Sequence, residues 1–402
     1  MITGGISERT LVWRLVQDHV RKELLFAATE FGVWFTIDGG EKWTRMKGGL
    51  PTISFRDITI QRRESDLVAA SFGRGFFILD DITPLREFKA EMIEKEALLF
   101  PVKDALLFQP RGVTVSPGNS EYRADNPPPG AVFTYYLKED MKSLKELRKK
   151  SEKELNETES DIPFPGWDAL EMELKEDDPF LVVTVKDAEG KVVNHVKAPA
   201  KKGIRRISWD LRYTSQRGLD PDEGSEELKV DSRGFMVPPG NYTATLFAVQ
   251  KGEMKQMTDA VGFAVKPLYE GVLEPVSTEQ REQFRKELEA AMLDYAAVQK
   301  ALKEAQNRVQ VAKNACFRME QDAGGLLDEI YRAEAKLAGL DEQLNGKKTK
   351  SEVGEKQENT PGMRFSVATR GLSTTYGPTP MHKESLQTGI EELQPLREQL
   401  KE

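Results

Sequence analysis

The chain has a single cysteine, Cys316, and only three histidines, His19, His195 and His382, which are scattered along 402 residues. One cysteine cannot form an intrachain disulfide, and isolated histidines give no cluster with the spacing of a zinc site. We therefore expect no disulfide framework and no bound metal or cofactor. Cys316 falls on an apolar helical pattern, so it is interpreted as a small buried side chain rather than a nucleophile.

Long apolar runs and a general basic surface are also lacking. No segment approaches the roughly 18 apolar residues of a membrane helix, and the amino terminus MITGGISERT lacks the layout of a signal peptide. The 66 acidic residues outnumber the 58 basic ones, and the net charge of −8 argues against a nucleic-acid partner. The sequence therefore predicts a protein that neither spans a membrane nor binds nucleic acid.

The amino-terminal part contains a repeat with a period of 42 residues. The segments LLFAATEFGVWFTID and DLVAASFGRGFFILDD are rich in β-branched and aromatic residues, and Ala27 of the first aligns with Ala69 of the second. This period, with several strands per repeat, is typical of β-propeller blades. Residues 1–90 are therefore predicted to be the last blades of a propeller that begins outside this chain.

The first repeat contains TIDGGEKW, which has the S/T-x-D-x-G-x-x-W pattern called the Asp box. We expect Asp38 to accept hydrogen bonds from backbone N–H groups of its own turn and Gly40 to permit a positive φ. Trp43 is expected to pack back against the hairpin. Thr36, Asp38, Gly40 and Trp43 are thus predicted to be structural rather than catalytic. A chance DGG hairpin is the competing interpretation.

These segments, together with TLVWRLVQDHV and NPPPGAVFTYYLKED, resemble the C-terminal part of the bacterial Asp-box (BNR) repeat proteins. The propellers of that family are similar to those of sortilin and of xyloglucanase-type glycoside hydrolases. The resemblance covers nearly the whole chain and implies an extracellular or cell-envelope protein whose N-terminal blades and export signal are missing here. Members are often labelled glycosyl hydrolase, but that label rests on propeller analogy, and fold does not imply function.

The middle of the chain is predicted to be a second β domain. Residues 91–130, dense in Pro, Gly, Ser and Asn towards their end, are predicted to be a linker. Short alternating strands over 131–270 predict an Ig- or fibronectin-like β-sandwich with Trp209 and Tyr242 as core anchors. A charged insertion over 140–178 is interpreted as a solvated excursion, and a docking surface around Phe164 and Trp167 is the alternative.

The carboxyl end is predicted to be helical. Apolar residues that recur every three or four positions predict an antiparallel coiled-coil hairpin over 271–346, through which the chain could oligomerise. Residues 347–378 are predicted to be a flexible linker because their first half is polar, and residues 379–402 a last helix. The expected fold class is mainly β with an α-helical C-terminal region: partial propeller blades, a sandwich and a helical hairpin.

Few residues qualify as candidates for a site. The turns TEFG and SFGRG occupy corresponding places in the two repeats, so Glu30 and Arg74 are predicted to lie on a possible binding surface. An ion pair between blades or a solvent-facing edge is the competing interpretation. The acids Asp57, Asp80 and Asp81 accompany Glu30, but no complete glycosidase pair, catalytic triad or nucleotide-binding loop can be assembled.

Three hypotheses for the function remain open. The first is a non-catalytic module for protein or glycan binding, or for assembly, at the cell envelope. The second is an accessory region of a glycoside hydrolase whose catalytic acids lie in the missing blades. The third is a scaffold that oligomerises through its coiled coil. Recognition predicts an exposed aromatic or charged patch, hydrolysis predicts paired acids in a groove, and scaffolding predicts an open apolar seam.

Overall fold

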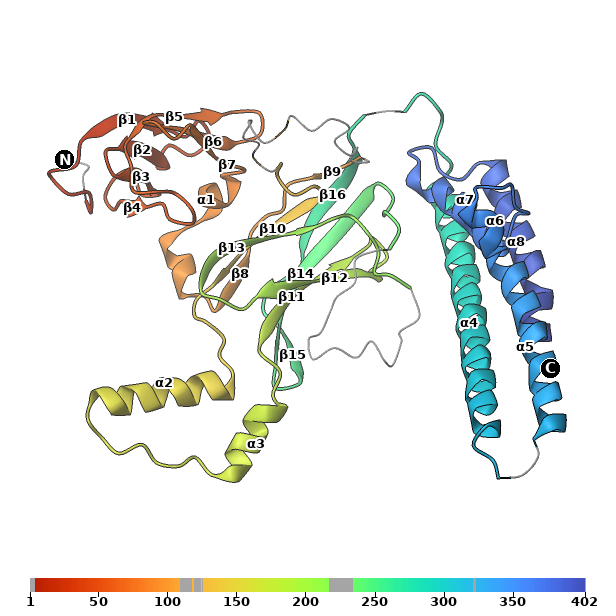
Figure 1. The fold of residues 1–402 in the computed structure, drawn as a ribbon. Helices are drawn as coiled ribbons and strands as arrows, with labels where there is room; N and C mark the ends of the chain where they lie inside the picture. The colour runs from red at the N-terminus through yellow and green to blue at the C-terminus, as the bar shows by residue number, and fades with distance from the viewer. Residues whose placement is uncertain are drawn as a thin grey trace. The chain divides into compact units, whose positions relative to one another are not determined.

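The computed structural model describes residues 4–108, 118, 124, 126–216, 234–269, 271–320 and 323–401. Its contacts divide the chain into two units. The first holds most of the residues up to 264, and the second holds residues 265–401 with short segments at 106–108, 211–216 and 234–240. The protein is mixed α/β, with several antiparallel sheets and a C-terminal helical region (Figure 1).

Two antiparallel sheets form the beginning of the first unit, with strand orders β1-β2-β3-β4 and β5-β6-β7. Sequential neighbours pair because each connection is a short turn. Alternate side chains of both sheets meet in one core, which includes Phe26, Phe55 and Ile58, all at most 1% exposed. The strands are β1 (Val12–Gln17), β2 (Leu25–Thr29), β3 (Gly32–Thr36), β4 (Thr44–Arg45), β5 (Phe55–Gln61), β6 (Asp66–Ser71) and β7 (Phe76–Leu79).

A buried ion pair joins the first sheet to the helix that follows the second, α1 (Thr83–Glu87). Arg86 donates from Nε and Nη2 to the two carboxylate oxygens of Asp18, at 2.9 and 2.8 Å. The Arg21 guanidinium donates to the carbonyls of residues 85, 86, 88 and 37, so it closes the same junction through the backbone. Burial raises the pKa of Asp18, but hydrogen bonds from Arg86 and from backbone N–H groups hold it below its usual value.

Two further antiparallel sheets occupy the middle of the chain, with orders β13-β10-β8 and β12-β11-β14-β16-β9, and β15 pairs with β14. Edge-to-face contacts between Trp209 and Tyr242, 5.7 Å, and between Phe133 and Phe263, 5.7 Å, join the two sheets. Trp209 and Tyr242 are 1% and 4% exposed, which confirms that they anchor a core. The strands are β8 (Ala97–Leu99), β9 (Ala105–Leu107), β10 (Ala131–Leu137), β11 (Phe180–Lys186), β12 (Val192–Pro199), β13 (Gly203–Trp209), β14 (Gly240–Gln250), β15 (Glu253–Gln256) and β16 (Val261–Pro267).

The expected linker over 91–130 is wrong in its first part. A 3₁₀ helix (Ala90–Glu94) is followed by β8 and β9, which pair with β10 and β16. The reason is visible in the sequence, because ALLF occurs twice, at 97–100 and 105–108, and Phe100 is buried against Phe88 and Tyr136. Residues 109–117, 119–123 and 125 lie outside the described part of the chain.

The charged insertion forms two helices, α2 (Leu144–Glu157) and α3 (Trp167–Lys175), between β10 and β11. Ser143 and Glu146 form a capping box at the start of α2. Pro163 and Pro165 stand between the helices, where residues before a proline avoid the helical conformation.

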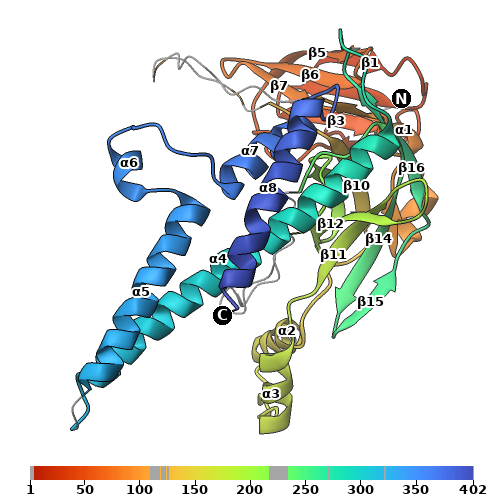
Figure 2. The ribbon, with the colours of Figure 1, turned by 90° about the vertical axis from the view of Figure 1, so that its right-hand side faces the viewer.

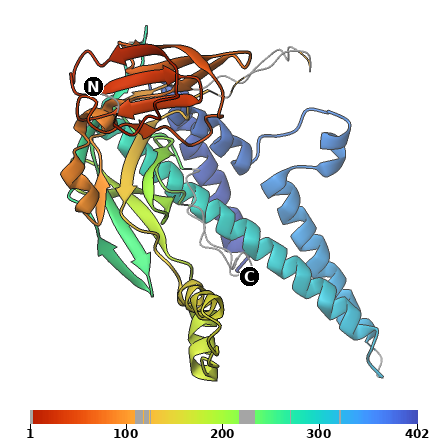
Figure 3. The ribbon, with the colours of Figure 1, turned by 90° about the vertical axis from the view of Figure 1, so that its left-hand side faces the viewer.

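The second unit is helical. Helix α4 (Thr278–Cys316) and helix α5 (Gly324–Asn345) are antiparallel, since Gln299 bonds Asn345 at 3.0 Å and Lys313 bonds Glu334 at 2.8 Å. Helix α8 (Pro380–Gln399) lies beside the first half of α4, as Figures 2 and 3 show. Cys316 is 6% exposed, in agreement with its interpretation as a buried side chain. In the described part of the chain, no helix has the length and apolarity needed to cross a bilayer.

The flexible linker expected over 347–378 also differs from the structure. It contains α6 (Lys348–Glu352), α7 (Pro361–Arg370) and a 3₁₀ turn (Gly371–Ser373). Helix α7 buries Phe365 and Ala368 in the core of the helical unit, with Leu372 beside them. These residues recur at helical spacing, but the polar run before them hid the pattern. Thr360 caps α7 by accepting the N–H of Met363 at 3.4 Å.

We predict that Asp18→Asn lowers the free energy of unfolding by about 3 kcal/mol, because Arg86 would remain buried without its charge partner. Urea denaturation followed by tryptophan fluorescence measures this in the first unit, since all five tryptophans lie between residues 13 and 209. The native pKa is depressed, so the stabilisation is complete above the ordinary pKa of about 3.9 and is lost as the pH falls through the native value.

The matched control is Asp57→Asn, because Asp57 pairs with Arg14 at 3.6 Å while both side chains are more than half exposed. That change is expected to cost under about 1 kcal/mol. An equal loss in the free energy of unfolding in the two variants would contradict the assignment of the buried pair. So would a fall in stability at low pH that is the same in Asp18→Asn as in the parent chain.

Candidate functional site

The turns that carry Glu30 and Arg74 lie at one end of the first two sheets. The Glu30 N–H donates to the carbonyl of Leu11 at 3.0 Å, just before β1, and the Phe72 N–H donates to that of Ser54 at 2.8 Å, just before β5. Each turn therefore lies beside the start of its sheet's first strand. Trp13 of β1 contacts Arg56 of β5, so both turns share an end. We call this end the rim, which comprises Trp13, Glu30, Phe31, Arg56, Phe72 and Arg74.

Arg56 is stacked at the centre of the rim. Its guanidinium carbon lies 3.7 Å from the ring centroid of Trp13 and 5.1 Å from that of Phe72. The pairing register shifts between Val12 and Arg14 and between Phe55 and Asp57, so Trp13 and Arg56 both occupy β-bulges. A bulge redirects a side chain and is common beside functional sites. The equivalent irregularities in the two sheets thus bring these side chains together.

Aromatic surface at the rim is open to water. Trp13 is 40% exposed, Phe31 50% and Phe72 69%. Each contact between a cation and an aromatic ring at an exposed site contributes about 0.5–1 kcal/mol, so the stack is held only weakly and can rearrange against a partner. Aromatic and arginine side chains are enriched where proteins bind one another.

The structure places Glu30 and Arg74 in this rim without joining them. Neither side chain forms an ion pair with any residue that the structure describes. Arg74 is exposed between Gly73 and Gly75, whose φ values of 80° and 74° permit the tight turn between β6 and β7. Both charges are therefore available to a ligand.

The Asp-box residues lie at the opposite end of β3, in the hairpin to β4. Asp38 Oδ1 accepts from Thr36 Oγ1 at 2.5 Å and from the Lys42 N–H at 3.0 Å, and the Gly40 N–H donates to Thr36 Oγ1 at 3.1 Å. Trp43 is buried against β2. Burial raises the pKa of Asp38, but these hydrogen bonds lower it overall, so the carboxylate stays charged and is held within its turn.

A second polar cluster surrounds Arg206 of β13. Its guanidinium donates to the backbone carbonyls of Asp80 and Asp81, and Asp66 Oδ1 accepts the Asp81 N–H at 2.9 Å. Burial, followed by the charge of Asp66, raises the pKa of Asp80. No pattern in the sequence indicates that Asp66 or Arg206 belongs to this cluster, and Arg206 lies 126 residues from Asp80.

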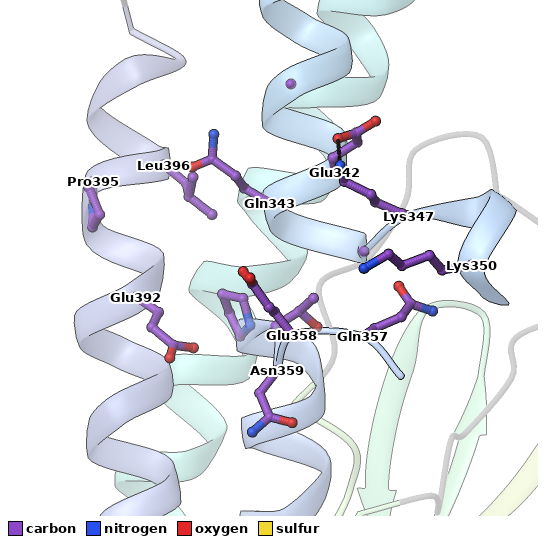
Figure 4. A pocket seen from close by; sticks show the side chains of 14 residues that line it. Glu342, Gln343, Lys347, Lys350, Gln357, Glu358, Asn359, Glu392, Pro395 and Leu396 are labelled. Carbon is purple, nitrogen blue, oxygen red and sulfur yellow. Dashed lines mark ion pairs between the residues drawn. The ribbon is translucent and has the colours of Figure 1, made fainter. Parts of the chain in front are cut away.

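The helical unit contains a polar pocket of about 640 Å³ at the carboxyl end of α5 (Figure 4). Glu342 and Lys347 pair across its edge at 3.5 Å, while Gln357 Oε1 and Glu392 Oε2 are buried with no hydrogen-bond partner among the described residues. Its mixed charges fit no particular cofactor. Among the residues described, no three His, Cys, Asp or Glu side chains are grouped as metal ligands.

No family model and no curated protein matches the sequence. Among solved structures, the chain is similar to two crystal structures of the extracellular domain of BT4673 from B. thetaiotaomicron. One of them names the protein a putative one-component system and the other a putative hybrid two-component system. Each is 13% identical, with a TM-score of 0.16, and covers 66% or 65% of this chain. Dimeric latent PorU from Porphyromonas gingivalis is 13% identical, with a TM-score of 0.19, and covers 64%.

The chain spans 26% of the length of the BT4673 structures and 20% of the PorU structure. TM-scores this low support no conclusion about the fold or the function of the present chain.

We predict opposite effects for Asp80→Asn and Asp81→Ala. The raised pKa of Asp80 means that its charged form is disfavoured in the folded protein, so this carboxyl costs stability as the pH rises above about 4. Asp80→Asn is therefore expected to keep or raise the midpoint of thermal unfolding at pH 7. Asp81→Ala is expected to lower it, because alanine removes the Asp81 Oδ1 acceptor of the Thr83 N–H at 3.1 Å and of Thr83 Oγ1 at 2.6 Å.

Thermal unfolding at pH 4.5 and pH 7 checks both variants. The difference between their unfolding midpoints should be larger at pH 7 than at pH 4.5. A lower midpoint for Asp80→Asn at pH 7 would show that its charge supports the fold.

Proposed function

We propose that this chain is a non-catalytic recognition module, which binds a protein or glycan partner through the rim. The observation that carries the proposal is the solvent-exposed stack of Trp13, Arg56 and Phe72. Large exposed aromatic surface is unfavourable in water unless a partner covers it. Arg56 adds donors in a planar fork, which suits carboxylates and hydroxyl-rich ligands.

The two charged turns extend this surface. Arg74 and Glu30 flank the stack without partners of their own among the described residues, so a ligand can pair with either. Flat aromatic faces accept the apolar face of a sugar ring as readily as they accept a protein side chain. Protein and glycan ligands therefore share one chemistry here, an apolar face with polar edges.

The finer architecture is proposed on the same grounds. Two antiparallel sheets, each built of strands that pair in sequence order, with bulges at Trp13 and Arg56 and equivalent turns, support an assignment of residues 1–90 to blades of a larger propeller. The facing sheets around Trp209 support an Ig-like sandwich over 131–270. We propose an extracellular or cell-envelope location from the sequence resemblance, and we propose that the helical unit contributes to oligomerisation from its heptad pattern.

An accessory region of a glycoside hydrolase is the second candidate. It is favoured by one observation, the raised pKa of Asp80, which burial and then the charge of Asp66 cause, because a carboxyl that holds its proton can act as a general acid. Arg206 is engaged with the backbone of the same turn, however, and thus acts as a structural clamp.

The test is binding of the full chain to immobilised β-glucans, xyloglucan and sialosides, and to a phage-displayed peptide library. A double variant, Trp13→Ala with Phe72→Ala, is expected to lose at least about tenfold in affinity for the selected ligand, since interface aromatics typically contribute more than 1.4 kcal/mol. Arg56→Lys should weaken binding less, because it keeps the charge but loses the planar stack.

The control is Phe317→Ala, which removes an aromatic side chain that is 73% exposed at the end of α4. It should leave affinity unchanged. Failure to select any ligand, unchanged affinity in the double variant, or release of reducing sugar from the glycans would each overturn the proposed function.

A further inference from the structure

The hairpin of α2 and α3 exposes a second aromatic surface, separate from the rim. Phe164 is 63% exposed and Trp167 77%, and their rings are 5.1 Å apart in an edge-to-face arrangement. Ile162 and Met172, which are close to this pair in the sequence, are 48% and 62% exposed. Single exposed apolar residues are ordinary, but a tryptophan at this exposure within an apolar group marks a contact surface.

The two helices of the hairpin are joined to one another, which holds α3, and Trp167 at its start, against α2. Arg148 of α2 donates to both carboxylate oxygens of Glu173 in α3, at 2.7 and 2.9 Å, and to Glu152 at 2.5 Å. The Leu144 N–H donates to Glu176 at 2.5 Å. A rigid surface loses less conformational entropy when it binds, which increases affinity.

The charge around the aromatic pair is strongly negative. Residues 157–178 contain nine acids and one base, a net charge of −8. Lys175 is already paired with Glu171 at 3.4 Å. Three acids close to the aromatic pair in sequence have no ion-pair partner among the described residues: Glu159, Asp161 and Asp168.

The four lysines of α2 form no ion pair with these three carboxylates, and Lys145 and Lys149 act instead on Glu173 of α3. Lys150 and Lys153 pair within their own helix, with Glu154 at 3.5 Å and with Glu157 at 3.8 Å. The segment that carries the aromatic pair therefore has an excess of negative charge, and three of its acids form no ion pair among the described residues. This combination repels anionic lipid and nucleic acid and attracts cationic side chains.

We infer that this surface, Phe164 and Trp167 with Glu159, Asp161 and Asp168, binds a basic segment of a protein partner. A lysine or arginine of that segment stacks on the indole face of Trp167, the best aromatic acceptor for a cation. The carboxylates neutralise its charge, and the apolar residues of the segment cover Ile162 and Phe164. The inference does not rest on the function proposed for the rim.

Local roles account for part of this arrangement. Asp168 lies in the first turn of α3, where a negative charge stabilises the helix, and the Phe164–Trp167 contact orders the loop. Neither role needs more than half of both rings to remain in water, and neither needs Glu159 and Asp161. A basic segment of a partner would account for the exposed ring surface and the unpaired carboxylates that these local roles do not require.

The experiment measures binding of three labelled, end-blocked peptides to the full chain by fluorescence anisotropy. All three contain leucine, with arginine in the first, glutamate in the second and glutamine in the third. We expect the arginine peptide to bind at least tenfold more tightly than the other two, and to lose affinity as salt rises from 50 to 300 mM, since ion pairing is screened.

The variants separate the two parts of the surface. Trp167→Ala should weaken the arginine peptide at least tenfold, while Trp167→Phe should retain part of the affinity. Glu159→Gln with Asp161→Asn should weaken it severalfold and reduce its dependence on salt. The matched controls are Phe317→Ala and the double variant Glu355→Gln with Glu358→Gln, which should change nothing.

Several results would overturn the inference. One is equal binding of the three peptides, and another is unchanged affinity in Trp167→Ala when its circular dichroism matches that of the parent chain. Self-association that Trp167→Ala abolishes, seen by sedimentation, would assign the surface to a second copy instead. Binding of neutral phosphatidylcholine vesicles that depends on Trp167 would assign it to a lipid surface.

Discussion

The first unit depends on the face-to-face burial of the two amino-terminal sheets. Side chains alternate across a strand, so the residues that fill this core, such as Phe26 and Ile58, leave their neighbours on other surfaces. A strict alternation would continue to the strand ends. The bulges at Trp13 and Arg56 interrupt it where the core ends, and the redirected side chains meet each other. The rim is thus a consequence of how the core terminates.

Buried charge in this protein holds segments together, and exposed charge remains for partners. Asp18 and Arg86 form a buried ion pair inside the first unit, and Arg206 donates hydrogen bonds to backbone carbonyls. Such groups cannot be offered to a ligand without leaving a buried charge unpaired, which costs several kcal/mol. Glu30 and Arg74 form no ion pair with any described residue, and neither do Glu159, Asp161 and Asp168 of the α2–α3 hairpin. This division separates residues that maintain the fold from those that can recognise a partner.

Contacts that are local in sequence could be predicted, and those that join distant segments could not. Alternation indicated the strands, and the burial of Trp209 and Tyr242 followed from their aromatic character in a strand-rich region. The turn positions of Glu30 and Arg74 came from the repeat, but the Arg56 stack depends on two bulges, which alternation alone does not reveal. The cluster of Asp66, Asp80 and Arg206 requires a contact across more than 120 residues. Helix α7 was missed because polar neighbours outweighed Phe365, Ala368 and Leu372.

The two exposed aromatic surfaces differ in the sign of the charge beside their rings. This difference matters more for selectivity than the hydrophobicity that they share. Apolar burial is non-directional and would attract many partners equally, whereas unpaired charge makes most of those contacts unfavourable. The rim has Arg56 at its centre and also contains Arg74. It therefore disfavours a basic ligand, unless Glu30 pairs with the cation of that ligand. The hairpin surface carries only carboxylates beside its rings and disfavours an acidic ligand. Selectivity at each surface therefore resides in the charges that the fold leaves unpaired, while the aromatic rings supply the affinity.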